Sequence, residues 1–161
     1  MAEGIETALS VSKALPNETV VASLSASQLK NVPVGSDIQK VIICADNDPA
    51  SSNTKKSVIE AVEFHLSEGR RVFIAIPPEI PAGLKKVDFN DVLKQGGTSA
   101  VQKILDQMIE IKDANTLKNQ EPQLSVTLQK IQAEQKKNVP VLQSESPQLP
   151  LTRAVNHELE R

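Results

Sequence analysis

Short apolar runs recur along the first 111 residues and predict β-strands. Three of these runs are rich in β-branched or small apolar residues and end at polar residues or prolines. They lie at residues 19–23, 40–45 and 71–76. The second run is apolar almost throughout, which is typical of a strand that is covered on both faces. These runs therefore predict a small, mainly parallel sheet.

Apolar residues at helical spacing separate the predicted strands. They predict helices at residues 4–15, 58–66 and 98–111. Pro16 ends the first helix, and Gly69 follows the second as a natural C-cap. Strands that alternate with helices are typical of βαβ units, in which helices cover both faces of the sheet. The predicted fold class is therefore α/β.

The pattern changes near residue 112, so we place a domain boundary between residues 1–111 and residues 112–161. The second part is rich in Gln and contains several Pro, and little of it is expected to form a core. Two amphipathic helices are predicted there, one with Leu124, Leu128 and Ile131 and another with Leu151, Val155 and Leu159. This part is either a largely disordered linker and tail or a set of helices that docks on a partner protein or a neighbouring domain.

Two carboxylates, Asp46 and Asp48, directly follow the apolar run at residues 40–45. Ligands of open α/β sheets bind at the carboxyl ends of strands. Oxygen ligands without a nearby thiolate or imidazole favour Mg²⁺, or Mn²⁺, over zinc. Alternatively, Asp48 caps a helix whose first residue is Pro49, and Asp46 is a solvated loop residue. The pair is therefore either a metal site or a helix cap with a loop residue beside it.

A third carboxylate, Glu3, stands before Gly4 at the start of the first predicted helix. A glycine at this position would let the backbone turn sharply from a strand end into the helix. If the strand before Glu3 were parallel to the others, Glu3 would lie at the same sheet edge as Asp46 and Asp48. Crowded carboxylates stay ionised only when cations neutralise them, so such an edge would bind a divalent metal. Glu3 could instead act as a general acid or base.

A further acidic stretch, with Asp88 and Asp91, follows the last predicted strand through a proline-rich connection and could reach the same edge. Lys85 and Lys86 lie just before it. These lysines are either contacts for phosphate groups or charges that only increase solubility. Together with the other carboxylates, Asp88 would complete an oxygen-rich pocket in which bound Mg²⁺ engages phosphate oxygens.

Three motifs in this order resemble the Toprim domain, the metal-binding catalytic module of bacterial primases, topoisomerases and some nucleases. They are Glu3-Gly4 opening a helix, Asp46-Asn47-Asp48 after an apolar strand, and Asp88-Phe89-Asn90-Asp91. The resemblance covers residues 2–96. The stretches around the motifs are similar to plasmid and phage primases and to relaxase-associated conjugative transfer proteins. The resemblance implies a Rossmann-like Toprim fold.

The same resemblance implies a role for each acidic residue. Glu3 would be the catalytic acid or base, and Asp46, Asp48 and Asp88 would bind Mg²⁺ or Mn²⁺. The resemblance implies a supporting role for Asp91. Lys85 and Lys86 are supporting residues too, as the candidate phosphate contacts described above. The implied function is metal-dependent phosphoryl transfer on nucleic acid, such as primase-like nucleotidyl transfer on single-stranded DNA, within a larger protein.

Only Met1 and Ala2 precede Glu3, where a Toprim sheet has a full strand. Two residues are too few for that strand, so we expect Glu3 to lack a rigid support and the chain to be a fragment or a degraded remnant. An inactive Toprim remnant that acts as an accessory or protein-binding module is therefore the alternative function. A phosphoacceptor domain of the receiver kind also has paired acids at a strand end, but a further acceptor Asp and a suitably placed Lys are not evident.

Composition narrows the classes of function that the chain could have. The chain has 161 residues, a formal net charge of -2 and 2% aromatic residues, so it offers few stacking platforms for bases and is not expected to bind polyanions strongly unaided. It carries no cysteine-rich zinc module and no phosphate-binding loop, so primer synthesis by this chain alone is not expected. Cys44 is expected in the core. His65 and His157 are expected to be surface or half-buried residues rather than metal ligands, because neither has a cysteine or second histidine at ligand spacing. Without an apolar span or signal peptide, we expect a cytoplasmic location and no membrane partner.

Overall fold

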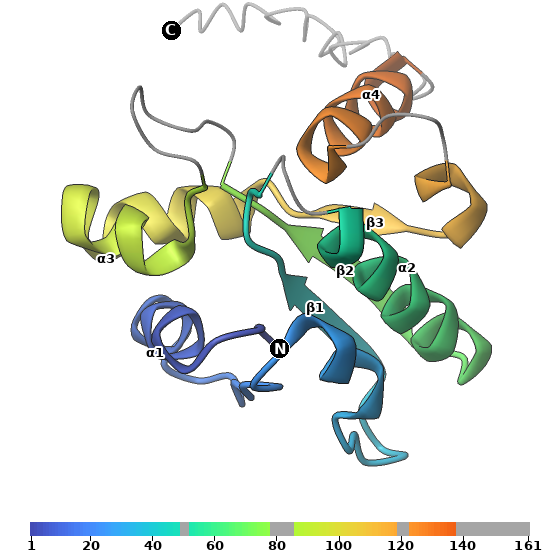
Figure 1. The fold of residues 1–161 in the computed structure, drawn as a ribbon, viewed down its shortest axis with the longest axis horizontal. Coiled ribbons are helices and arrows are strands. Elements are labelled where there is room, and N and C mark those ends of the chain that lie inside the picture. Colours follow the sequence, from blue (N-terminus) through green and yellow to red (C-terminus); the bar gives the residue numbers. More distant parts are fainter. Residues whose placement is uncertain (49–51, 78–85, 119–122, 138–161) are drawn as a thin grey trace, which may run out of the picture.

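The computed structural model describes residues 1–48, 52–77, 86–118 and 123–137 (Figure 1). Three strands form one sheet in the order β1-β2-β3. They are β1 (Lys40–Cys44), β2 (Arg71–Ala75) and β3 (Ile109–Ile111). The pair β1 and β2 is parallel, as expected, whereas β3 pairs with β2 in the antiparallel direction. The sheet is therefore mixed.

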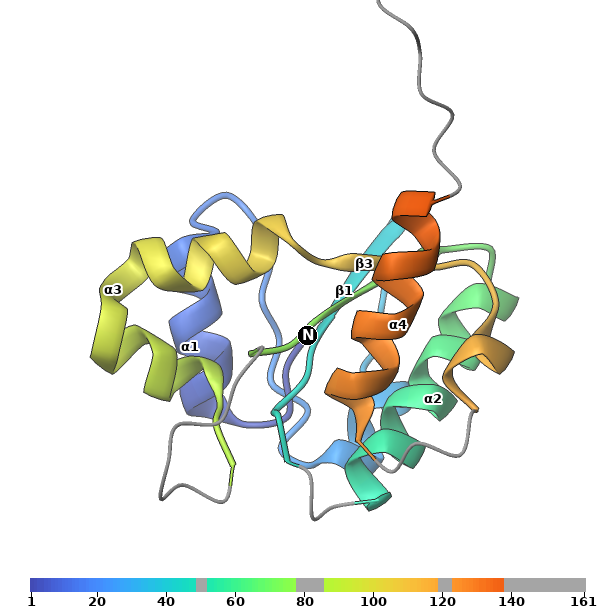
Figure 2. The same cartoon turned by 90° about the horizontal axis from the view of Figure 1, so that it is seen from above.

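Helices cover both faces of the sheet, which confirms the predicted α/β class (Figure 2). The described residues form α1 (Ile5–Ala14), α2 (Ser52–Ser67), α3 (Phe89–Asp106) and α4 (Leu124–Lys137), with short 3₁₀ helices η1 (Ala26–Asn31) and η2 (Ala114–Leu117). Side chains of a strand alternate between faces. Accordingly, Ile43 packs with α2 and α4, while Cys44 packs with α1 and α3. Cys44 is a buried core residue, as predicted.

Helix α3 differs from the helix predicted at residues 98–111. It begins at Phe89, bends at Gly97, where φ is 67° and ψ is -171°, and ends at Asp106. Glycine suits this bend because residues with a side chain rarely adopt positive φ. Ile109 and Ile111, which were predicted to end the helix, form β3 instead. Both are buried against the sheet, so pairing with β2 outweighs the helical spacing of the preceding residues.

The segment around the predicted strand 19–23 forms only an isolated bridge. Ala2 lies between this segment and β1, with parallel bridges to Ala22 and Cys44. The Ala2 N–H donates to the Val21 carbonyl (2.9 Å), and the Ala2 carbonyl accepts from the Ser23 N–H (2.8 Å). Ala2 is fully buried. The expectation that Glu3 lacks a support is therefore wrong, since Ala2, directly before it, is bridged to β1 on one side and to Ala22 on the other.

The hydrophobic core continues beyond residue 111, contrary to the expectation that little of this part forms a core. Leu117, Leu124 and Leu128 are buried in the same cluster as the sheet residues that face α2. The first predicted amphipathic helix is thus α4, and it docks on the sheet of its own chain (Figures 1 and 2). The second, at residues 151–159, and His157 lie outside the described residues.

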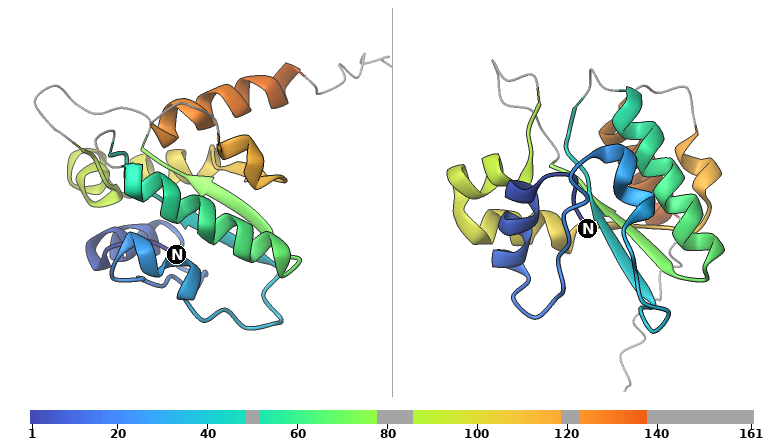
Figure 3. Two further views of the ribbon diagram at one scale, coloured as in Figure 1. Left: turned by 45° about the vertical axis from the view of Figure 1, so that its right-hand side comes forward. Right: turned by 60° about the horizontal axis from the view of Figure 1, so that its bottom comes forward.

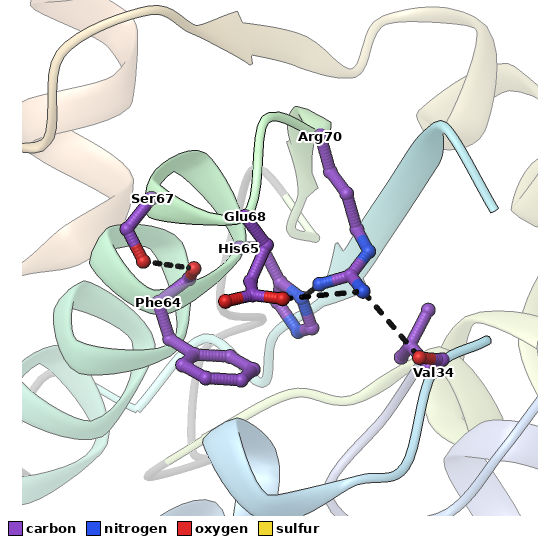
Figure 4. A network of polar contacts seen from close by, with 6 residues as sticks. All are labelled: Val34, Phe64, His65, Ser67, Glu68 and Arg70. Atoms are coloured by element: carbon purple, nitrogen blue, oxygen red, sulfur yellow. Dashed lines mark hydrogen bonds and ion pairs between the residues drawn. The ribbon is translucent and has the colours of Figure 1, made fainter. Parts of the chain in front are cut away.

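His65 is another correction, because it was expected at the surface or half buried and is fully buried (Figure 4). It lies near the end of α2, where its Nδ1 is 3.3 Å from a guanidinium nitrogen of Arg70. Arg70 also donates to the Val34 carbonyl at 3.4 Å. The histidine and arginine thereby connect the end of α2, the start of β2 and the segment before β1.

Candidate functional site

Three of the predicted carboxylates lie in one open groove at the carboxyl end of β1. Glu3, Asp46 and Asp88 all line this groove, which has a volume of about 350 Å³. Each comes from a different segment of the chain: Glu3 follows the bridged Ala2, Asp46 follows β1, and Asp88 is the N-cap of α3. We call this the acidic groove. The structure thus assembles the carboxylates that the sequence placed in three separate motifs.

Burial and neighbouring charge act together on Asp46. They raise the pKa of its carboxyl to about 6, with burial the largest cause, followed by the charges of Asp88 and Glu3. Lys86 and a hydrogen bond from Thr7 oppose this shift in pKa. The Thr7 hydroxyl donates to Asp46 Oδ1 at 3.4 Å. A divalent cation in the groove would relieve the repulsion between these carboxylates and favour the ionised form of Asp46.

Asn47 was not singled out from the sequence as a site residue, yet its hydrogen bonds connect the segments that carry Asp46 and Asp88. Its N–H donates to the Val87 carbonyl at 2.9 Å, and its carbonyl accepts from the Val87 N–H at 3.1 Å. Its side-chain Nδ2 donates to the Pro77 carbonyl at 2.8 Å. In the chain, Asp46 directly precedes Asn47, and Asp88 directly follows Val87. The bridge therefore holds their segments together across the groove.

Asp88 and Asp91 also have a structural role at the start of α3. The Asp91 N–H donates to Asp88 Oδ1 (2.9 Å), and the Asp88 N–H donates to Asp91 Oδ2 (3.2 Å). This reciprocal arrangement is a capping box, which satisfies donors that a helix start would otherwise leave without partners. Asp91 is not among the residues described as lining the acidic groove. Its contact is with Asp88, which it holds in place.

The other predicted site residues do not all lie in the acidic groove. Lys86 is exposed and lines the acidic groove. Asp48 is half buried and is not among the described residues that line this groove. Lys85 and Pro49, the residue that Asp48 would cap in the alternative interpretation, lie outside the described residues. Gly4 has φ of -100°, which any residue adopts, so its predicted role in a sharp turn is not needed.

The rim of the acidic groove contains two exposed apolar side chains. Ile5 is 58% exposed and Leu24 is 73% exposed. Leu24 has φ of 69°, in the left-handed region that residues other than glycine rarely occupy. Such backbone conformations tend to cluster at functional sites. The rim thus offers an apolar surface beside the carboxylates.

The donor set fits a magnesium ion that is held by few protein ligands. Within the described ranges, no group of three Asp, Glu, His or Cys side chains could hold a metal ion by itself. Mg²⁺, however, commonly binds through one or two carboxylates and keeps several waters. Glu3, Asp46 and Asp88 offer only hard oxygen atoms, and the charges of Glu3 and Asp88 add to the burial that raises the pKa of Asp46. The groove therefore suits a partly hydrated hard cation rather than a closed protein cage.

The comparison with protein families agrees with this site. The model of the family described as the Toprim domain matches residues 1–99, which is more than half of the chain. The chain therefore belongs to the Toprim family, whose domains generally perform Mg²⁺-dependent phosphoryl transfer on nucleic acid. No curated protein matches the chain. None of the helices in the described part is long and apolar enough to cross a membrane.

Proposed function

We propose that this chain is the Mg²⁺-dependent catalytic Toprim domain of a primase-like or conjugative DNA-transfer protein and acts on single-stranded DNA. The observation that carries this proposal is the convergence of Glu3, Asp46 and Asp88 in one groove. The family match supports the reaction class. The similarity of the motif stretches to plasmid and phage primases and to transfer proteins supports the finer assignment.

In this proposal Asp46 and Asp88 would bind a partly hydrated Mg²⁺ ion in the acidic groove, and Asp48, two residues beyond Asp46, would contribute to the site through bound water. When bound, Mg²⁺ stabilises negative charge on a phosphoryl group and lowers the pKa of a hydroxyl or water nucleophile. Glu3 accepts or donates the proton at its carboxylate as the general base or acid. Lys86, which lines the same groove, pairs with a phosphate oxygen of the substrate.

Other residues of the chain keep these groups in place. Thr7 orients one oxygen of Asp46, and the bridge between Asn47 and Val87 holds the two acidic segments together. The apolar rim with Ile5 and Leu24 contacts the uncharged part of the substrate. Precise support of this kind matters because catalytic geometry tolerates little looseness.

The test is a calorimetric Mg²⁺ titration of the double variant Asp46→Asn and Asp48→Asn. We expect it to lose Mg²⁺ binding while it remains folded, because an amide at position 46 avoids the cost of burying a charge. The matched control is Asp37→Asn, an exposed residue of the segment that precedes β1, at the opposite end of that strand. It should bind Mg²⁺ like the parent protein. An unchanged titration for the double variant would refute the metal site.

Activity is tested separately with single-stranded DNA and Mg²⁺ or Mn²⁺. The proposal predicts that phosphodiester bonds are made or cut and that Glu3→Gln abolishes this reaction without loss of Mg²⁺ binding. If the protein binds Mg²⁺ and a protein partner but neither makes nor cuts such bonds, the accessory-module function is the correct one.

A further inference from the structure

A second groove adjoins the acidic groove, and Glu3 lines both. This second groove has a volume of about 490 Å³ and is formed by the start of η1 and the first turns of α2. The two helices pack side by side (Figure 3). We call it the hydroxyl groove, because its lining is rich in short polar side chains. Those used in the argument below are Ser25, Ser27, Asn53, Lys56 and Ser57.

The charge of the hydroxyl groove differs from that of the acidic groove. Glu60 lines it but forms an ion pair with Lys30 at 2.7 Å, so its negative charge is compensated. Lys56 is exposed at the same groove and adds a positive charge. Counted with Lys30, which pairs with Glu60 from outside the groove lining, these three residues carry one net positive charge, that of Lys56.

The start of α2 adds to this positive potential. Asn53, Lys56 and Ser57 lie in the first two turns of a 16-residue helix. The amino end of such a helix carries a partial positive charge and N–H groups without partners within the helix. Phosphate contacts in nucleic acid complexes come from lysines, from hydroxyl and amide side chains, and from helix amino ends. The hydroxyl groove combines all of these groups.

We propose that the hydroxyl groove binds the sugar–phosphate backbone of single-stranded DNA next to the phosphate that reacts at Glu3. This proposal rests on the function proposed above and specifies where the DNA next to the reacting phosphate lies. Lys56 pairs with one phosphate, and Ser57 donates to a phosphate or sugar oxygen. The hydroxyls of Ser25 and Ser27 are hydrogen-bonded to each other (3.1 Å), and the one that does not donate in this bond donates to the backbone of the DNA. With only three aromatic residues in the chain, contacts are made to the backbone rather than to stacked bases, so binding is independent of sequence.

The experiment measures binding of a fluorescent oligothymidylate by anisotropy, in EDTA, at several salt concentrations. One phosphate contact on single-stranded DNA contributes about 0.7 to the slope of log affinity against log salt. Lys56→Gln should therefore reduce the slope by about 0.7. Because the ionic contribution to affinity vanishes near 1 M salt, this change in slope corresponds to binding about eightfold weaker at 0.05 M salt. Ser27→Ala should weaken binding without changing the slope.

The matched control is Lys103→Gln, an exposed lysine near the end of α3 that lines neither groove. It should leave the affinity and the slope unchanged. The inference is overturned if Lys56→Gln has the same slope as the parent, or if the parent protein does not bind the oligonucleotide at low salt. Because this titration contains no metal and the Mg²⁺ titration contains no DNA, the two proposals fail separately.

Discussion

Replacing Asn47 with Ala tests whether one buried amide holds the acidic groove together. The change removes the hydrogen bond from Nδ2 to the Pro77 carbonyl (2.8 Å). Asn47 is 4% exposed and Pro77 is buried, so water cannot readily take the place of the lost donor. The two backbone bonds between Asn47 and Val87 do not involve the side chain and can persist.

The expected loss of stability follows from this environment. A buried carbonyl that loses its donor costs about 1–3 kcal/mol. For a domain of this size, the melting temperature falls by about 2–4 °C for each kcal/mol. Asn47→Asp should cost more at neutral pH, because a carboxylate would face the Pro77 carbonyl and burial of its charge is unfavourable. At acidic pH the protonated acid can donate, so the difference from the parent should shrink.

Urea denaturation and the Mg²⁺ titration are the assays. Asn47→Ala should lower the free energy of unfolding and weaken Mg²⁺ binding, because the loss of the bond to the Pro77 carbonyl loosens the segment that carries Asp46. The matched control is Asn17→Ala at an exposed site, which should change stability by no more than about 0.5 kcal/mol. If Asn47→Ala is as stable as the parent and binds Mg²⁺ equally well, the side chain does not support the groove.

Two further predictions concern the core. Burial and the nearby Arg70 lower the pKa of His65 below its usual 6.5, so below that pH the unfolded chain binds more protons than the folded one, and stability should fall as the pH drops. Urea denaturation between neutral and mildly acidic pH should show this fall in stability, and the fall should be smaller in His65→Leu. An identical pH dependence in the variant would show that His65 does not cause the fall. Leu128→Ala should cost about 2–5 kcal/mol, because Leu128 is 1% exposed in the core. If α4 were not docked on the sheet, Leu128→Ala would lower the free energy of unfolding by no more than about 0.5 kcal/mol.

The sequence allowed the order of the main elements and the acidic edge to be predicted. The apolar run before Asp46 is dense enough to be recognised as a buried strand, and β1 ends within one residue of the predicted end. Glu3, Asp46 and Asp88 were expected at one sheet edge and do line one groove. The capping box of Asp88 and Asp91 was not predicted, because the helix was expected to begin only at residue 98; Asp88 was interpreted as a metal ligand and Asp91 as a supporting residue.

Other features depended on contacts between distant segments. Thr7 carried a weak signal, as a polar residue on the apolar face of α1, and only the structure shows it bonded to Asp46. Nothing local marks Asn47, whose partners Pro77 and Val87 follow thirty or more residues later. The three-residue strand with Ile109 is too short to be distinguished from a helix end by its own pattern.

By itself, the sequence determined the helices α1, α2 and α4, the strands β1 and β2, and the chemical groups that follow these strands, because apolar periodicity and residue type are local properties. The tertiary structure decided which of those groups meet. It placed Asp46 among other carboxylates, gave Asp91 a helix cap to complete, and docked Leu128 on the sheet. These outcomes depend on which surfaces remain uncovered once the strands pair, and that is a property of the whole fold.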